Sequence, residues 1–137
     1  MIVLDTNIVL DLYVFNDPQA QPLKLALAAR KLRWLATPPM RDELARVLAY
    51  PKIVVRLASY LITAEDVLAQ FDAQVHWREV AAKASVTCRD PDDQKFIDLA
   101  VAHKAQLLSK DNAVLCMRKR LVTHGVRAQD AMNFVAV

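Results

Sequence analysis

The chain has 137 residues, of which 55% are hydrophobic and 24% are charged, a composition that fits one globular domain over residues 1–137 and excludes a disordered protein. It contains a single glycine, Gly125, which argues against the glycine-rich phosphate loops of P-loop and dinucleotide-binding proteins. The formal net charge of +3 is compatible with a polyanionic partner, but this excess is too small to identify one.

The first half of the chain alternates between strand-like and helical segments. The apolar run at residues 1–4 has the character of a buried parallel strand and ends at Asp5. A loop is expected around residues 16–18, where Asn, Asp and Pro follow one another. In chain order we then expect a helix at residues 22–31, a strand at 32–36, and helices at 39–49 and 53–61.

The second half begins with a clear helix start. Thr63 is a suitable N-cap and Asp66 takes the capping-box position, so a helix is expected from there to about residue 84. Asp90 as N-cap and Pro91 at the first helical position predict another helix to about His103. A strand at 106–109, a helix to about 120 and a strand after Gly125 follow. This order predicts an α/β sandwich with a mostly parallel central sheet.

The cysteines and the apolar segments indicate the compartment. Cys88 and Cys116 have neither metal-ligand spacing nor a CxxC motif, so we expect reduced thiols in a reducing compartment. Asp5 interrupts the apolar start, which is therefore not expected to act as a signal peptide. No segment approaches the roughly 20 apolar residues of a membrane span. These features predict a cytoplasmic protein without membrane contact.

Two acids directly follow predicted strands. Asp5 follows the first strand, and Asp111 follows the strand at 106–109. Ligands of open α/β sheets bind at the carboxyl ends of the strands, so both positions are candidates for a functional site. Aspartate is also common as a cap or turn residue after a strand, and this alternative stays open for either position taken alone.

Two further acids share the apolar faces of predicted helices. Asp93 lies three and four residues before Phe96 and Ile97, on the stripe that would pack against the sheet. Glu43 lies three residues after Met40 on its own apolar stripe. A charge on an inward face is costly without a partner. A bound cation would be such a partner, and so would a salt bridge from Glu43 to a buried arginine.

These positions separate four acids from the others: Asp5, Glu43, Asp93 and Asp111. Four carboxylates at one sheet edge repel one another unless something neutralises them, and Mg²⁺ or Mn²⁺ suits an all-carboxylate site. Asp90 and Asp92 are sufficiently explained by their favourable interaction with a helix N-terminus. The three histidines lack mutual ligand spacing and are expected to be structural or surface residues.

The sequence resembles the PIN-domain family of metal-dependent nucleases, in particular its VapC-like toxins. The resemblance rests on four ordered segments that together span most of the chain: residues 3–8 (VLDTNI), 39–44 (PMRDEL), 88–100 (CRDPDDQKFIDLA) and 107–111 (LLSKD). It implies a three-layer α/β/α sandwich. The family's catalytic and metal-binding acids fall on the same four positions that the residue pattern selects.

The resemblance also assigns supporting roles. Thr6 and Asn7 match polar residues beside the first acid, and Ser109 matches a hydroxyl position usually held by threonine. These three would orient ligands or contact phosphate. Two departures from the family pattern bear on metal affinity and substrate preference. Gln94 stands where related sequences often have another aspartate, and Lys110 replaces the usual glycine before the late acid.

The activity that the resemblance implies is hydrolysis of RNA phosphodiester bonds with one or two Mg²⁺ or Mn²⁺ ions, leaving a 5′-phosphate and a 3′-hydroxyl. It further implies the toxin of a toxin–antitoxin pair, a homodimer and a cognate antitoxin protein. The alternative is a catalytically silent PIN-like module that binds RNA or a partner protein, against which the four acids argue. A phospho-acceptor or phosphatase using Asp5 is disfavoured, because the dehalogenase type of site needs an acid where Asn7 stands.

Basic and apolar residues are candidates for contacts with partners. RNA contacts are expected from Arg41, Arg46, Lys110 and Arg118. For the run at 118–120, a solvated helix C-terminus that complements the helix dipole is an equally good explanation. The apolar stretch at 53–55, with Leu57 and Leu61, could form an interface, but helix packing explains it as well.

Overall fold

The computed structural model describes residues 1–130. Its centre is a five-stranded sheet in the order β3-β2-β1-β4-β5, in which every pair of neighbouring strands is parallel. The register places Leu4 beside Leu108, so β1 and β4 end next to each other. The strands are β1 (Ile2–Leu4), β2 (Trp34–Ala36), β3 (Val75–Trp77), β4 (Gln106–Leu108) and β5 (Ala128–Gln129).

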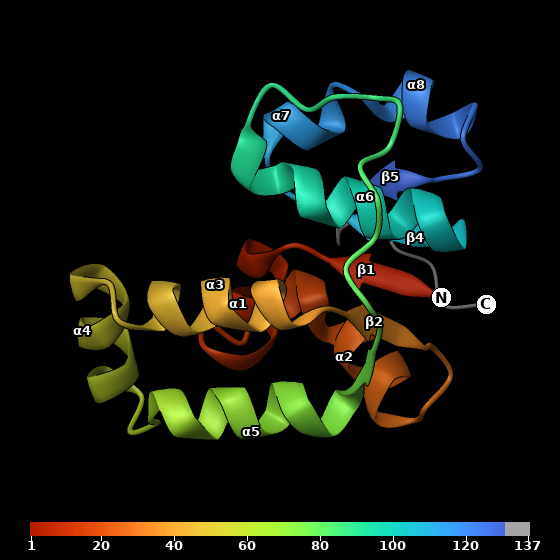
Figure 1. Cartoon of the computed structure of the whole chain (residues 1–137). Coiled ribbons are helices and arrows are strands. Elements are labelled where there is room, and N and C mark those ends of the chain that lie inside the picture. The colour runs from red at the N-terminus through yellow and green to blue at the C-terminus, as the bar shows by residue number, and fades with distance from the viewer. Residues whose placement is uncertain (131–137) are drawn as a thin grey trace.

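Helices cover the sheet. Helix α6 packs against β1 and β4, α7 and α8 against β5, and α3 against α1, α4 and α5. Helices α4 and α5 lie toward one end of the molecule and α7 and α8 toward the other (Figure 1). The fold is a three-layer α/β/α sandwich, as the sequence predicts. The helices are α1 (Thr6–Tyr13), α2 (Gln21–Ala28), α3 (Pro38–Leu48), α4 (Pro51–Ser59), α5 (Ala64–Gln74), α6 (Gln94–His103), α7 (Asn112–Leu115) and α8 (Arg118–Val122), with 3-10 turns η1 (Pro18–Ala20) and η2 (Pro91–Asp93).

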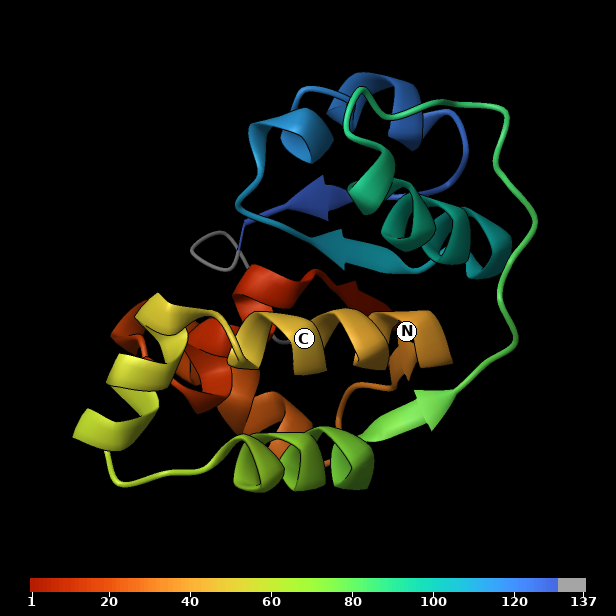
Figure 2. The same ribbon diagram turned by 60° about the vertical axis from the view of Figure 1, so that its left-hand side comes forward.

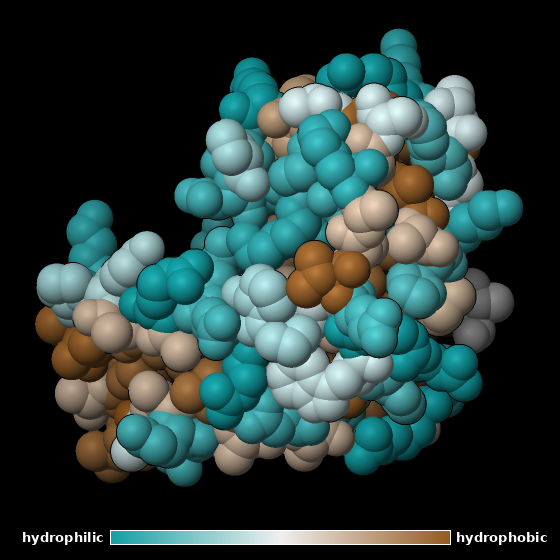
Figure 3. Space-filling view, viewed as in Figure 1, coloured by the Kyte–Doolittle hydropathy of each residue, from teal (hydrophilic) through white to brown (hydrophobic). Residues whose placement is uncertain are grey.

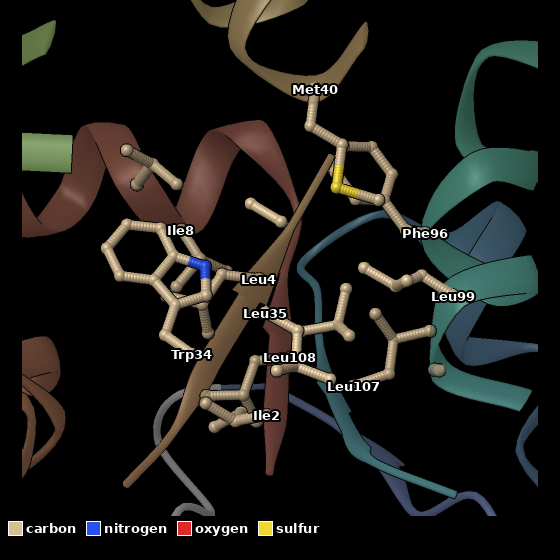
Figure 4. Close-up of a cluster of buried hydrophobic side chains, with 14 of the residues drawn as sticks. Ile2, Leu4, Ile8, Trp34, Leu35, Met40, Phe96, Leu99, Leu107 and Leu108 are labelled. Carbon is tan, nitrogen blue, oxygen red and sulfur yellow. The ribbon is translucent and has the colours of Figure 1, made fainter. Parts of the chain in front are cut away.

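The core forms around the central strands, whose side chains are almost all buried. Phe96 and Leu99 of α6 and Met40 of α3 pack with side chains of β1, β2 and β4 (Figure 4). Trp34 of β2 stacks edge to face on Phe71 of α5, with ring centroids 5.1 Å apart. Each large apolar side chain buried in this way contributes about 1.5–3 kcal/mol, so this core holds the strand ends in fixed positions.

The structure differs from the expected elements at three places. Residues 6–13 form α1 directly after β1, where no helix was expected. The helix that begins at the Thr63 capping box is confirmed, but it ends at Gln74 and is followed by β3. The helix expected up to residue 120 is divided into α7 and α8. The other expected elements are present within a few residues of their predicted limits.

A long irregular segment, residues 78–90, connects β3 at one edge of the sheet to η2 (Figure 2). It crosses the molecule (Figure 1) and leads to η2, whose Asp90 and Asp93 lie near Asp111, the cap residue of α7. No helix within residues 1–130 has the length and apolar character that a membrane span requires.

Candidate metal centre

The candidate site lies where β1 and β4 end. Asp5 follows β1 and is 3% exposed, and Ser109, which is wholly buried, follows β4. The Ser109 hydroxyl donates a short hydrogen bond to Oδ2 of Asp5, and the backbone N–H of Ile8 donates to Oδ1 over 3.1 Å. Ser109 Oγ also accepts from the backbone N–H of Asp111 over 3.0 Å. The two strand-end acids are therefore linked through one hydroxyl.

Burial makes ionisation of Asp5 costly. It raises the pKa of this carboxyl from 3.8 to about 6, although the hydrogen bonds from Ser109 and Ile8 act in the opposite direction. The negative charges of Asp111 and Glu43 raise the pKa further. Asp5 is thus a carboxylate that a nearby cation would favour in its charged form.

A second group of acids surrounds Asp93. One carboxylate oxygen from each of Asp90, Asp93 and Asp111 lies within 4.8 Å of the other two. Asp90 caps η2 by accepting from the Asp92 N–H over 3.0 Å, and Asp111 caps α7 by accepting from the Ala113 N–H over 2.9 Å. The Oδ2 atom of Asp93 is buried and has no hydrogen-bond partner among residues 1–130. An oxygen in this condition needs either a proton or a cation.

The electrostatics of this group fit a cation. Burial, followed by the nearby Asp111 carboxyl, raises the pKa of Asp93 well above its usual range. The pKa of Asp111 is lowered, first by a side-chain hydrogen bond with Asp93 and then by the hydrogen bond from the N–H of Ala113. Without a metal, the Asp93–Asp111 pair therefore favours retaining a proton between its two carboxyl groups. The donors are all carboxylate oxygens, which are the ligands that Mg²⁺ and Mn²⁺ prefer.

Asp90 was not among the residues selected from the sequence. Its predicted role as a cap is confirmed, but it also joins the acidic group. The signal in the sequence was the spacing of Asp90 and Asp93, three residues apart around Pro91, which places both carboxylates on the same side of a tight turn.

Glu43 faces the same region from α3, but both of its oxygens are already bound. Thr6 donates a short hydrogen bond to Oε2, and Nζ of Lys95 lies 2.7 Å from Oε1. The salt bridge that the sequence analysis gives as an alternative for Glu43 is therefore present, but its partner is a lysine and not an arginine. Lys95, which sequence reasoning missed, also donates to the backbone carbonyl of Asp92.

The molecule has a hollow on the side where α7 and the start of α6 lie. The space-filling view shows it between the end of the molecule that carries α7 and the end that carries α4, bordered by hydrophilic residues (Figure 3). Asn7, at the start of α1, is exposed. None of the three histidines joins the acidic group found among residues 1–130.

A family model described as "PIN domain" matches residues 1–113. The chain belongs to the PIN domain family. Its fold is also similar to a solved structure, "Crystal structure of VapBC2 from Rickettsia felis bound to a DNA fragment from their promoter", with a TM-score of 0.62 and 16% sequence identity. That match covers 95% of this chain and 98% of the other. The comparison with curated proteins finds no match.

Within this PIN domain, Gln94 acts as a clamp on the long irregular segment. Its side-chain amide donates to the Val86 carbonyl over 3.0 Å and to Asp98 over 2.8 Å, and its oxygen accepts from the Cys88 N–H over 2.6 Å. An aspartate could accept but not donate. The departure from the pattern of related sequences therefore has a local structural reason.

The second departure, Lys110, forms an ion pair. Its Nζ lies 2.8 Å from Oδ2 of Asp11, a nearly buried carboxylate on α1. Arg41 is likewise engaged, because its guanidinium donates to both oxygens of Asp72 over 2.8 and 3.0 Å. Arg46 and Arg118 are exposed. Of the four basic residues expected to contact RNA, two are thus held in ion pairs with other parts of the PIN domain.

Proposed function

We propose that this PIN domain is a metal-dependent ribonuclease of the cytoplasm that hydrolyses RNA phosphodiester bonds. The observation that carries the proposal is the convergence of Asp90, Asp93 and Asp111 around a buried carboxylate oxygen without a partner. Asp5 lies beside this group and is tied to it through Ser109.

The residues that would hold Mg²⁺ or Mn²⁺ are Asp5, Asp93 and Asp111, with Asp90 and Glu43 at the sides. When bound, the ion would polarise the phosphodiester and favour ionisation of an attacking water. Ser109 keeps Asp5 oriented, and the N–H of Ala113 does the same for Asp111. Thr6 fixes the carboxylate of Glu43. Asn7 and the exposed Arg46 and Arg118 are proposed to contact RNA phosphates, which would make affinity depend strongly on salt.

We further propose that the protein is a toxin whose partners are an antitoxin protein and a second copy of the chain. The similar Rickettsia felis structure is a VapBC2 complex, which motivates this part. Helix α4 and Leu61, two residues beyond its end, offer a surface for a protein partner. Leu57 is buried, but Val54, Val55 and Leu61 are 48%, 68% and 92% exposed, so helix packing accounts for only part of this apolar stretch.

The decisive experiment is cleavage of RNA by the purified protein with Mn²⁺ and with EDTA. We expect cleavage with Mn²⁺ only, and at least a hundredfold loss in Asp5→Asn. Asp17→Asn is the matched control. Asp17 accepts a backbone hydrogen bond at the start of the turn η1, as Asp5 does at the start of α1. Cleavage that persists in EDTA or in Asp5→Asn would rule the proposal out. RNA binding without any cleavage would favour the catalytically silent module.

A further inference from the structure

Lys95 occupies a position that helix electrostatics disfavour. It is the second residue of α6, at the N-terminal end of the helix, where the backbone dipole is positive. A cation there does not stabilise the helix. Its side chain is only 23% exposed, so it is not a freely solvated lysine either. The reason for its position lies in the groups that surround its ammonium.

Three groups hold this ammonium in place. Nζ lies 2.7 Å from Oε1 of Glu43, whose side chain is 16% exposed, and it also donates to the Asp92 carbonyl. The ring of Phe96 lies below it, with its centroid 4.8 Å from Nζ. Lys95 therefore joins α3 to η2, the turn that carries Asp90 and Asp93.

The contact between Lys95 and Glu43 distinguishes Glu43 from the acids around Asp93. Glu43 already has a cation on one oxygen and the Thr6 hydroxyl on the other. Within residues 1–130, Asp90, Asp93 and Asp111 form no salt bridge, and Asp93 retains its unpartnered oxygen. A divalent ion placed at Glu43 would have to displace the ammonium or remain close to it. Repulsion between two cations grows with the product of their charges.

We propose that the ammonium of Lys95 is the second cation of this site, so that each chain binds one divalent ion and not two. The single ion would be held by Asp5 and the acids around Asp93, while Lys95 neutralises Glu43. This inference rests on the proposed metal-dependent function and specifies the cation content of the same site. It assigns Lys95 as a positioning residue that fixes Glu43 and the turn η2.

The test is the number of Mn²⁺ ions bound per chain, measured by equilibrium dialysis and by electron paramagnetic resonance. We expect one ion in the wild-type protein, with the spectrum of an isolated Mn²⁺. Lys95→Met keeps an unbranched side chain of nearly the same length but removes its charge, and we expect it to bind two ions with spin coupling between them. Lys95→Arg retains a charge and should still bind one. Lys52→Met, on the exposed side of α4, is the control for loss of a lysine.

The outcomes separate this inference from the proposed function. Two ions in the wild-type protein, or one ion in a folded Lys95→Met protein, would overturn the role of Lys95 and leave the metal-dependent function intact. Absence of Mn²⁺ binding by the wild-type protein would overturn both. Circular dichroism of each variant identifies any that fail to fold, in which case Lys95→Gln takes the place of Lys95→Met under the same criteria.

Discussion

Ser109 determines how two acids of the site are connected. Its buried hydroxyl donates to Asp5 and accepts from the N–H of Asp111, so one side chain serves both strand-end acids. We predict that Ser109→Ala lowers the free energy of unfolding by about 1–3 kcal/mol, because a half-buried N–H and a buried carboxylate each lose a partner. It should also weaken Mn²⁺ binding, since the ionised form of Asp5 loses a donor.

Urea denaturation and Mn²⁺ titration measure these two effects. Ser85→Ala, in the exposed part of the 78–90 segment, is the control and should change stability by less than about 0.5 kcal/mol. Equal stability and equal Mn²⁺ affinity in Ser109→Ala and the wild-type protein would show that the hydroxyl does not couple the two acids.

At the scale of single residues, the sequence identifies acids whose positions follow a local rule. Asp5 and Asp111 are found because they follow strands, and Asp93 and Glu43 because they share apolar helix faces. Asp90 is missed because its role as a cap already explains it. Lys95 is missed because its partner Glu43 lies 52 residues away, and no local pattern distinguishes it from a solvated lysine.

At the scale of elements, the clamp formed by Gln94 connects α6 to the 78–90 segment. We predict that Gln94→Glu lowers the free energy of unfolding by about 1–3 kcal/mol, because it removes the donor to Val86 and places a carboxylate beside Asp98. The favourable effect of an acid near a helix N-terminus is smaller, about 0.3–1 kcal/mol. Amide exchange should accelerate at residues 84–88.

Hydrogen exchange and urea denaturation measure this prediction. Gln70→Glu introduces the same change on the exposed surface of α5, and we expect it to leave both measurements nearly unaltered. Unchanged exchange at residues 84–88 in Gln94→Glu would mean that other contacts hold the segment. The predicted site would then not depend on this clamp to place Asp90.

The elements that sequence analysis missed lack the patterns on which such analysis depends. Most residues of helix α1 are buried, and its short apolar run at residues 8–10 does not by itself distinguish a buried helix from a buried strand. Strand β3 is three residues long with one buried side chain, and it follows α5 without a glycine or proline between them. Its existence depends on pairing with β2, which is a long-range contact. The strands β1, β2 and β4 were predictable because all or nearly all of their residues are buried.

At the scale of the whole molecule, the parallel sheet gathers charges that oppose folding. Burial raises the pKa of Asp5 to about 6 and also raises the pKa of Asp93. An acid whose pKa is higher in the folded state than in the unfolded state stabilises the fold when it is protonated. This stabilisation is complete below the unfolded-state pKa of 3.8 and is lost as pH rises through the folded-state pKa. Asp111 has a lowered pKa, so its contribution is lost only as pH falls below about 4.

In EDTA, the free energy of unfolding is therefore predicted to fall between about pH 4 and pH 8, with Asp5 alone accounting for on the order of 3 kcal/mol, lost by about pH 6 to 7. The amide that Asp5→Asn introduces cannot ionise, and its oxygen can still accept from the N–H of Ile8. This variant should therefore show a shallower decline and exceed the wild-type protein in stability at about pH 7. Mn²⁺ should reverse this order, because binding to the ionised acids stabilises only the wild-type protein. Urea denaturation across this pH range measures both proteins with and without Mn²⁺. If stability depended on pH equally in the wild-type protein and in Asp5→Asn in EDTA, the charge on Asp5 would carry no folding cost. The neighbours of Asp5 would then already compensate its charge, and replacing the carboxylate by an amide would not stabilise the protein.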